Sequence, residues 1–186
     1  VIQNAANSGV GRSVIAIARA RGLRTLNIVR RPELIEELTA LGADRVLCDA
    51  EDAPRDFCAA TDGAPVRLAL NAVGGESALR IANALAKNGT HVTYGAMGRQ
   101  PVKIPNGLLI FKNIAFRGFW VSGWYRSASR EAREAMFADL FPLLAVGQIS
   151  TPIERTYSLD ACREALARAA QPSRNGKILF EMQPGT

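Results

Sequence analysis

Residues 1–11 decide the fold, and they read VIQNAANSGVG. Val1–Gln3 is a short apolar start with the character of a buried strand, and the small polar stretch Asn4–Ser8 follows it. Gly9–Arg21 then carries apolar side chains at helical spacing, and Gly22 ends that helix. A strand, a turn of small residues and a helix in this order predict the first half of a βαβ unit.

Strand and helix patterns alternate along the rest of the chain, which predicts a parallel sheet. Short apolar runs predict strands over Thr25–Val29, Arg45–Cys48, Val66–Asn71, Gly89–Tyr94, Ile114–Gly118, Ile153–Tyr157 and Lys177–Phe180. Helical spacing predicts helices over Pro32–Leu41, Asp52–Ala60, Glu76–Leu85, Asn106–Phe111, Ser129–Val146 (long and amphipathic) and Leu159–Ala170. The aromatic segment Phe119–Ser127 is expected to be irregular. The predicted fold class is α/β, a Rossmann-type doubly wound parallel sheet with helices on both faces.

The turn after the first strand has small residues where a dinucleotide-binding turn has its glycines. Against the pattern GxGxxG, Ala6 stands first, Ser8 in the middle and Gly11 third. Small side chains let backbone N–H groups approach a pyrophosphate, and the helix that follows points its positive end at that phosphate. Turns of this kind also occur without a ligand, so spacing alone leaves both interpretations open.

The end of the second strand indicates which dinucleotide would bind. In NAD-preferring domains an acidic residue about 20 positions after the glycines bonds the ribose 2′-hydroxyl. Arg30 and Arg31 stand there instead, and guanidinium groups pair with a 2′-phosphate through forked hydrogen bonds. The alternative is a solvated arginine pair at the start of a loop. The position favours the phosphate interpretation, and therefore NADPH.

Further candidate contacts lie where the fourth and fifth strands end, because ligands bind outside the carboxyl ends of strands in such sheets. Asn71 ends one of these strands, and the small-residue stretch Tyr94-Gly95-Ala96-Met97 follows the other. A plain turn after a strand would have the same composition, so both interpretations stay open here as well.

Composition and charge restrict the class of partner. The net charge is +6, but the Lys and Arg residues are scattered rather than clustered with aromatic residues, so no nucleic-acid partner is expected. No apolar run approaches the ~20 residues that span a bilayer, so no membrane partner is expected. Cys48, Cys58, Cys162 and the lone His91 form no ligand pattern, which predicts no metal site and a reducing compartment.

Five segments resemble the medium-chain dehydrogenases/reductases, and most of all their 2-enoyl thioester reductases of the mitochondrial fatty-acid synthesis type. They are NSGVG (Asn7–Gly11), LGADRV (Leu41–Val46), LALNAVGG (Leu68–Gly75), VTYGAMGRQPV (Val92–Val102) and LLIFKNIAFRGFWVS (Leu108–Ser122). The resemblance runs from Val1 to about Met182 and implies reduction of the trans-2 double bond of an acyl thioester with NADPH.

The resemblance also implies a role for each matching residue. The pyrophosphate would be held by Asn7, Ser8, Gly9 and Val10, and the 2′-phosphate by Arg30 and Arg31. The path from adenosine to nicotinamide would be lined by Tyr94, Gly95, Ala96 and Met97. The nicotinamide would be covered by Phe119, Trp120, Val121 and Ser122, and a further contact would be Lys177. The family often has one more residue between its two basic positions, which weakens the match at Arg31.

The family's catalytic tyrosine lies in an N-terminal GroES-like domain that this sequence lacks, so no catalytic residue is expected here. Residues 1–182 are predicted to form the NADP-binding domain with a C-terminal return strand, and residues 183–186 a tail. We expect the chain to be a piece of a longer protein, and to reduce nothing by itself. Its compartment would be the cytoplasm of a bacterium or the mitochondrial matrix of a eukaryote.

The expected substrate is a thioester of coenzyme A or of acyl carrier protein, and the expected partner is a second copy joined through the edge strand Ile114–Gly118. The aromatic patch of Phe119, Trp120, Trp124 and Tyr125 suits either a subunit interface or a wall of an acyl pocket. Two other functions stay open at this point. One is reduction of quinones or of enones without a thioester, and the other is a non-catalytic NADPH-binding module.

Overall fold

The computed structural model describes residues 1–50, 57, 59–171, 174 and 176–182. The chain divides into two compact units, Val1–Ile149 and Ser150–Thr186, and each is described by itself. The predicted helix over Asp52–Ala60 falls largely on residues outside the described ones.

The first unit is built on a six-stranded parallel sheet, with the strands in the order β3-β2-β1-β4-β5-β6. The strands are β1 (Ile2–Gln3), β2 (Leu26–Val29), β3 (Arg45–Cys48), β4 (Leu68–Asn71), β5 (Thr90–Thr93) and β6 (Ala115–Gly118). This order is that of a doubly wound dinucleotide-binding sheet, and it places the reversal of strand order between β1 and β4. The predicted fold class is confirmed.

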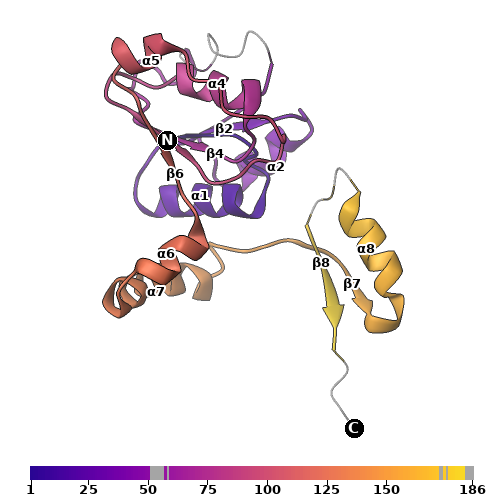
Figure 1. The fold of residues 1–186 in the computed structure, drawn as a ribbon. Coiled ribbons are helices and arrows are strands. Elements are labelled where there is room, and N and C mark those ends of the chain that lie inside the picture. Colours follow the sequence, from indigo (N-terminus) through magenta and orange to yellow (C-terminus); the bar gives the residue numbers. More distant parts are fainter. Residues whose placement is uncertain (51–56, 58, 172–173, 175, 183–186) are drawn as a thin grey trace. The chain divides into compact units, whose positions relative to one another are not determined.

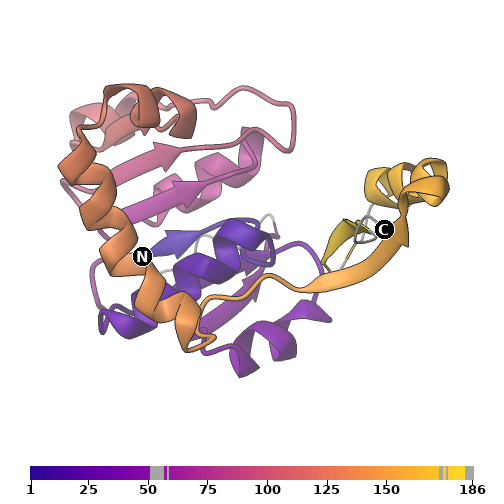
Figure 2. The ribbon, with the colours of Figure 1, turned by 90° about the horizontal axis from the view of Figure 1, so that it is seen from below.

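Helices cover both faces of this sheet. They are α1 (Gly9–Ala20), α2 (Leu34–Ala40), α4 (Gly75–Asn83), α5 (Asn106–Ile110), α6 (Val121–Ser127) and α7 (Arg130–Ala145). Figure 1 shows α4 and α5 on one side of the strands and α1 on the other. Helix α7, drawn in orange, lies on the α1 side (Figure 2), where Asp139 pairs with Arg21 at 2.9 Å.

Two clusters of buried side chains form the core, one on each face of the sheet. The first includes Ile2 and Ile28 from the strands with Ile81 and Leu85 from the α4 region. The second packs α1 and α2 through Ala6, Ile15, Val29, Leu34, Leu38, Ala43 and Val46. Because successive residues of a strand face opposite sides, neighbours such as Ile28 and Val29 belong to different clusters.

Three sequence predictions about helices are corrected. The aromatic segment Phe119–Ser127 is not irregular, because Val121–Ser127 forms α6. Helix α7 forms within the predicted range Ser129–Val146, but none of its residues is buried, so the long helix predicted to be amphipathic has no fully buried side. The helix predicted over Leu159–Ala170 starts with a 3₁₀ turn, η1 (Leu159–Ala161), and continues as α8 (Cys162–Ala170).

The second unit consists of two parallel strands and the helical segment between them. Strand β7 (Ile153–Ser158) pairs with β8 (Lys177–Glu181), and α8 contacts both strands. These strands form a sheet of their own within the described residues. The return of the last strand to the nucleotide-binding domain stays a prediction. Among the described helices of the whole chain, none has the length and apolar character needed to cross a membrane.

Candidate functional site

The candidate site lies at the edge of the six-stranded sheet where its parallel strands end. The loops after β1, β4 and β5 meet there, and α1 begins at the same edge. In doubly wound sheets a ligand binds at this edge, in the crevice where the strand order reverses. Here the crevice lies between β1 and β4.

The turn before α1 is compact because a glycine in the first turn of α1 allows a close approach. A Cβ atom at Gly11 would lie 2.5 Å from the carbonyl oxygen of Ala6, so only glycine fits there. Ser8 caps the helix, since its hydroxyl accepts a hydrogen bond from the Gly11 N–H at 3.1 Å. The carbonyl of Asn7 accepts from Nε of Arg12 at 3.3 Å, which ties the turn to the first turn of α1.

The start of α1 leaves backbone donors free for a ligand. The Gly9 and Val10 N–H groups have no acceptor in the described part of the chain, as expected for the first positions of a helix. The Val10 side chain at this helix end is exposed. Together with the helix dipole, these donors suit a phosphate group.

The two arginines after β2 differ in their exposure and in their ion-pair partners. Arg30 is exposed and makes no ion pair with any described residue. Nη1 of Arg31 lies 3.6 Å from Oε1 of Glu33, which partly neutralises its charge. The structure therefore leaves Arg30 as the better group for an incoming phosphate, in line with the weaker match at Arg31.

The loop after β5 is joined to the loop after β4 by backbone hydrogen bonds. The Met97 N–H donates to the Ala72 carbonyl at 2.9 Å, and the Gly98 N–H donates to the Val73 carbonyl at 2.8 Å. A Cβ atom at Gly98 would lie 3.0 Å from that Val73 oxygen, so a small residue is needed where the loops meet. Met97 is a large, exposed apolar residue of this loop.

Tyr94 brings a buried hydroxyl to the same edge. Its Oη is inaccessible to solvent and has no hydrogen-bond partner of normal geometry in the described part of the chain. Burial raises the pKa of Tyr94, and the nearby Ser8 hydroxyl opposes that rise in part. The Tyr94 hydroxyl therefore lies close to the Ser8 hydroxyl that caps α1, at the edge where the loops meet.

The aromatic segment follows β6 at the same edge of the sheet. The Phe119 N–H continues the ladder by donating to the Thr93 carbonyl at 2.9 Å, and Trp120 is the N-cap residue directly before α6. The guanidinium carbon of Arg126 lies 4.4 Å from the centre of the Trp120 ring. Phe119, Trp120, Val121 and Ser122 are all exposed.

Most of the predicted contact residues thus meet at one edge of the first unit. Asn7–Val10, Arg30, Arg31, Tyr94–Met97 and Phe119–Ser122 all follow the carboxyl ends of strands. Lys177 is the exception, since it begins β8 in the second unit. Their contacts with a cofactor stay predictions.

Asn71 was expected as a candidate contact, but its side chain is buried and bonded to protein groups. Sequence reasoning also missed Asn4 and Ser77, which share this buried network. A polar residue directly after a buried strand was the available signal for Asn4.

The described residues do not provide a metal site, because no three or more His, Cys, Asp or Glu side chains among them gather closely enough. His91 is buried in β5 against Phe116, with 5.0 Å between ring centres. It therefore has the surroundings of a packed residue.

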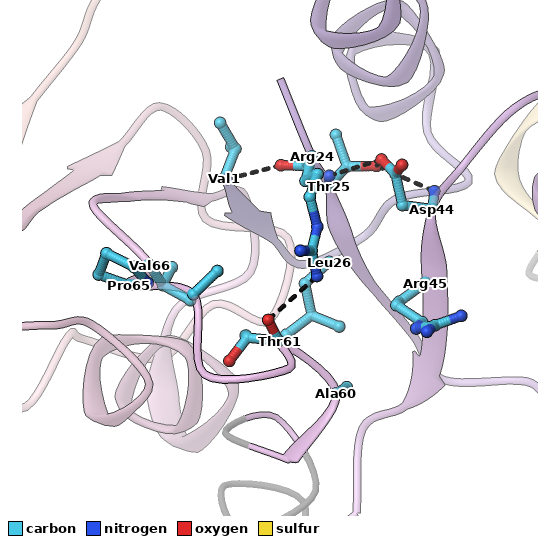
Figure 3. Close-up of a pocket in the computed structure, with 11 residues that line it drawn as sticks. Val1, Arg24, Thr25, Leu26, Asp44, Arg45, Ala60, Thr61, Pro65 and Val66 are labelled. Atoms are coloured by element: carbon cyan, nitrogen blue, oxygen red, sulfur yellow. Dashed lines mark hydrogen bonds between the residues drawn. The ribbon is translucent and has the colours of Figure 1, made fainter. Parts of the chain in front are cut away.

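A cavity of about 60 Å³ lies at the opposite edge of the sheet, and Figure 3 shows the residues that line it. They come from the starts of strands, and examples are Thr25 before β2 and Arg45 in β3. None of the predicted contact residues lines this cavity. We place the candidate site at the carboxyl edge, where the free helix donors and the exposed arginine are.

Comparison with known proteins gives the following similarities. The pattern of the zinc-binding dehydrogenase family matches residues 9–138. The human mitochondrial enoyl-[acyl-carrier-protein] reductase is 41% identical over 98% of this chain and 50% of its own length. Etr1p of Candida tropicalis, solved as a complex with NADP and crotonyl-CoA, has a TM-score of 0.82 and 28% identity over 97% of this chain and 53% of Etr1p.

A Mesorhizobium loti protein described as a putative NADPH:quinone reductase has a TM-score of 0.83 and 29% identity, over 97% of this chain and 52% of its own. The chain therefore spans about half the length of the relatives it matches.

Proposed function

The chain belongs to the zinc-binding dehydrogenase family of the medium-chain dehydrogenases/reductases, and from this we propose that it is the NADPH-binding part of an oxidoreductase. The proposed reaction is reduction of the trans-2 double bond of an enoyl thioester in fatty-acid synthesis. The support for this choice is the similarity to enoyl-[acyl-carrier-protein] reductases and to Etr1p.

One observation carries the cofactor proposal. Two features follow the adjacent strands β1 and β2 at the same edge of the sheet: N–H groups at the start of α1 and the exposed Arg30, neither of which has a partner among the described residues. A pyrophosphate and a 2′-phosphate are the two anionic groups of NADPH, and the two features suit one each. Glycine at position 11 and the tightly joined loops after β4 and β5 leave the backbone close to the cofactor path.

The proposed assignment gives each group of residues one task. Asn7, Ser8, Gly9 and Val10 bind the pyrophosphate, and Arg30, assisted by Arg31, binds the 2′-phosphate. Tyr94–Met97 lie along the dinucleotide, with the Tyr94 hydroxyl as a donor, and Phe119–Ser122 exclude water from its nicotinamide end. Lys177 is a further contact. When bound, NADPH supplies the hydride for the reduction.

We assign no catalytic residue within this chain. The proton that completes the reduction would come from a part of the protein outside residues 1–186. The chain alone is therefore proposed to bind NADPH without turnover, and without zinc, for which the described residues offer no ligand set. We propose a coenzyme A or acyl-carrier-protein thioester as substrate, and a compartment that is mitochondrial in a eukaryote or cytoplasmic in a bacterium.

We also propose a dimer through the open edge of β6. That strand ends the sheet, so its outer backbone groups can pair with a second copy. Etr1p forms a heterodimer with Etr2p, which supports an assembly of two chains.

The experiment uses two proteins, the chain of residues 1–186 and a full-length protein that contains it. NADPH titration of the chain should show saturable binding, and the chain with NADPH and crotonyl-CoA should show no oxidation of NADPH. The full-length protein should oxidise NADPH with crotonyl-CoA. Failure of the chain to bind NADPH would contradict the cofactor proposal, and turnover by the chain alone would contradict the absence of a catalytic residue.

A second candidate is a quinone or enone reductase, because the Mesorhizobium loti structure resembles the chain as closely as Etr1p does. Comparison of kcat/KM for crotonyl-CoA and a quinone in the full-length protein separates the two. Activity on neither substrate, with NADPH binding intact, would favour a non-catalytic module.

A further inference from the structure

Two asparagine side chains meet at the point where the strand order reverses. Asn4 follows β1 directly and Asn71 is the last residue of β4, so each stands at the mouth of the crevice. Asn4 is 1% exposed and Asn71 is fully buried. A buried amide group destabilises the fold unless its hydrogen bonds are made. The hydrogen-bond partners of Asn4 and Asn71 therefore indicate what the two side chains do.

Each hydrogen bond of the network that they form has a defined donor and a defined acceptor. Nδ2 of Asn4 donates to Oδ1 of Asn71 at 2.8 Å and to the Ser77 hydroxyl at 3.1 Å. The same Oδ1 atom of Asn71 accepts from the Val73 and Gly74 N–H groups at 3.1 and 3.0 Å. This oxygen thus accepts three donors, and it holds the loop after β4 in a tight turn.

The other atoms of the two amides extend the network to neighbouring elements. Oδ1 of Asn4 accepts from the Ala72 N–H at 2.8 Å, which ties the residue after β1 to the loop after β4. Nδ2 of Asn71 donates to the Thr93 hydroxyl at 3.1 Å, at the end of β5. The Ala72 carbonyl in turn accepts from Met97, in the loop after β5.

We propose that Asn4 and Asn71 are positioning residues, whose paired amides lock the loops after β1, β4 and β5 into one rigid platform before the cofactor arrives. The proposal rests on the proposed NADPH site, because these loops carry its pyrophosphate and nicotinamide contacts. Neither side chain is placed to touch a ligand. They act by fixing where the backbone donors and the Tyr94–Met97 segment stand relative to each other.

The assignment of donors and acceptors distinguishes a positioning role of the two amides from simple packing of their side chains. An Asn4→Asp change keeps the shape but puts an oxygen opposite Oδ1 of Asn71. Rotation of the Asn71 amide would relieve that contact only by taking the acceptor away from Val73 and Gly74. An Asn71→Asp change keeps the three-donor oxygen, and the Thr93 hydroxyl can donate to the new carboxylate. The two isosteric changes should therefore differ.

Amide hydrogen exchange of the unchanged chain without cofactor gives the first test. If the platform opens as one unit, the Ala72, Val73, Gly74, Met97 and Gly98 amides should have protection factors within about tenfold of one another. A larger spread would mean that the loop after β5 moves independently, and it would overturn the proposal. This measurement needs no variant to fold.

The variants give the second test. Asn4→Asp should speed exchange at Ala72, Met97 and Gly98 by about tenfold or more, whereas Asn71→Asp should change it by less than that. The matched control is Asn113→Asp, because Nδ2 of Asn113 donates to Oδ1 of Asn88 in an exposed pair at the opposite edge of the sheet. Equal exchange in Asn4→Asp and the control would contradict the coupling.

NADPH titration completes the design. Asn4→Asp should raise the Kd for NADPH and for NADH by a similar factor, about tenfold, since positioning of the shared pyrophosphate is lost and the 2′-phosphate contact is not. If Asn4→Asp speeds amide exchange but leaves the Kd for NADPH unchanged, the rigidity of the loops does not affect cofactor binding, and the proposal is overturned. If the unchanged chain binds no NADPH, the proposed function fails, while the exchange measurements still decide whether the loops are coupled.

Discussion

Gly11 lies so close to Ala6 that a Cβ atom on it would stand 2.5 Å from the Ala6 carbonyl oxygen. The contact joins the first turn of α1 to the loop that leaves β1, and it brings the start of the helix against the end of the strand. The side-chain Nε2 of Gln3 donates to the Gly11 carbonyl at 2.9 Å, which fixes the same region from the strand side.

Replacement of Gly11 by alanine should therefore destabilise the chain. Alanine is worth up to about 1 kcal/mol more than glycine within a helix, but a backbone clash of this kind costs about 1–3 kcal/mol, so the net change should be a loss. The measurement is urea unfolding followed by circular dichroism. Gly107→Ala is the control, because its nearest neighbour would be a Phe111 side-chain atom at 3.7 Å and the helix preference should prevail. A Gly11→Ala variant as stable as that control would contradict the close approach.

Arg30 should determine the preference for NADPH over NADH. A charge-assisted hydrogen bond to a phosphate contributes about 1.5–3 kcal/mol, so Arg30→Ala should raise the Kd for NADPH by about ten- to a hundredfold and leave that for NADH nearly unchanged. Arg31→Ala should have a smaller effect because Glu33 already lies 3.6 Å from its guanidinium. Fluorescence titration of the unchanged chain and of both variants with NADPH and NADH measures the six affinities. Equal affinities for NADPH and NADH in the unchanged chain would refute the arginine assignment.

The proposed dimer can be tested at Gly118. In β6 the Ala115 and Phe119 N–H groups point to β5, so the Gly118 N–H, one residue before Phe119, points to the open edge. Gly118→Pro removes that outer donor and should shift the dimer toward monomer in analytical ultracentrifugation. Gly118→Ala keeps the donor, and its Cβ atom has open space, so it should stay dimeric. A Pro variant with unchanged dimerisation would place the interface elsewhere.

His91 should make stability depend on pH in the acid range. Burial lowers its pKa below the usual value of about 6.5, although a hydrogen bond with the Ala78 backbone opposes the effect. The unfolded chain then binds a proton at a higher pH than the folded chain does. Stability is therefore complete above about pH 6.5 and falls as the pH drops toward the lowered pKa of the folded state.

His91→Gln removes this titration while leaving every carboxylate in place. The free energy of unfolding from urea melts between pH 7.5 and 5 should fall more steeply for the unchanged chain than for the variant. The chain has one histidine, so no other imidazole contributes to the difference. Parallel curves would mean that the buried ring titrates normally.

Much of the fold was predictable because its signals are local. Alternating apolar strands and helical spacing are properties of short segments, and Arg45–Cys48 forms β3 over the predicted range. The segment after β6 was not predictable in the same way. Its aromatic residues have no helical period, yet Val121–Ser127 is helical once Phe119 has completed the ladder to Thr93.

Some residues of the candidate site are likewise predictable from short segments of sequence, and others are not. The small turn before α1 and the arginines after β2 are each visible in a few consecutive residues. Asn71 looked like a ligand contact because its position is right, and only its burial shows that its amide serves the protein instead. Burial depends on what packs against a residue, and no single segment contains that information.

Local sequence patterns indicate the alternation of strands and helices, the glycine at the start of α1 and the arginines that favour NADPH. The hydrogen bond between Asn4 and Asn71, which are 67 positions apart, exists only in the folded sheet. The physical reason is the order of the strands. The chain passes from β1 through β2 and β3 before β4 returns to the other side of β1, and only that return brings the two amides together.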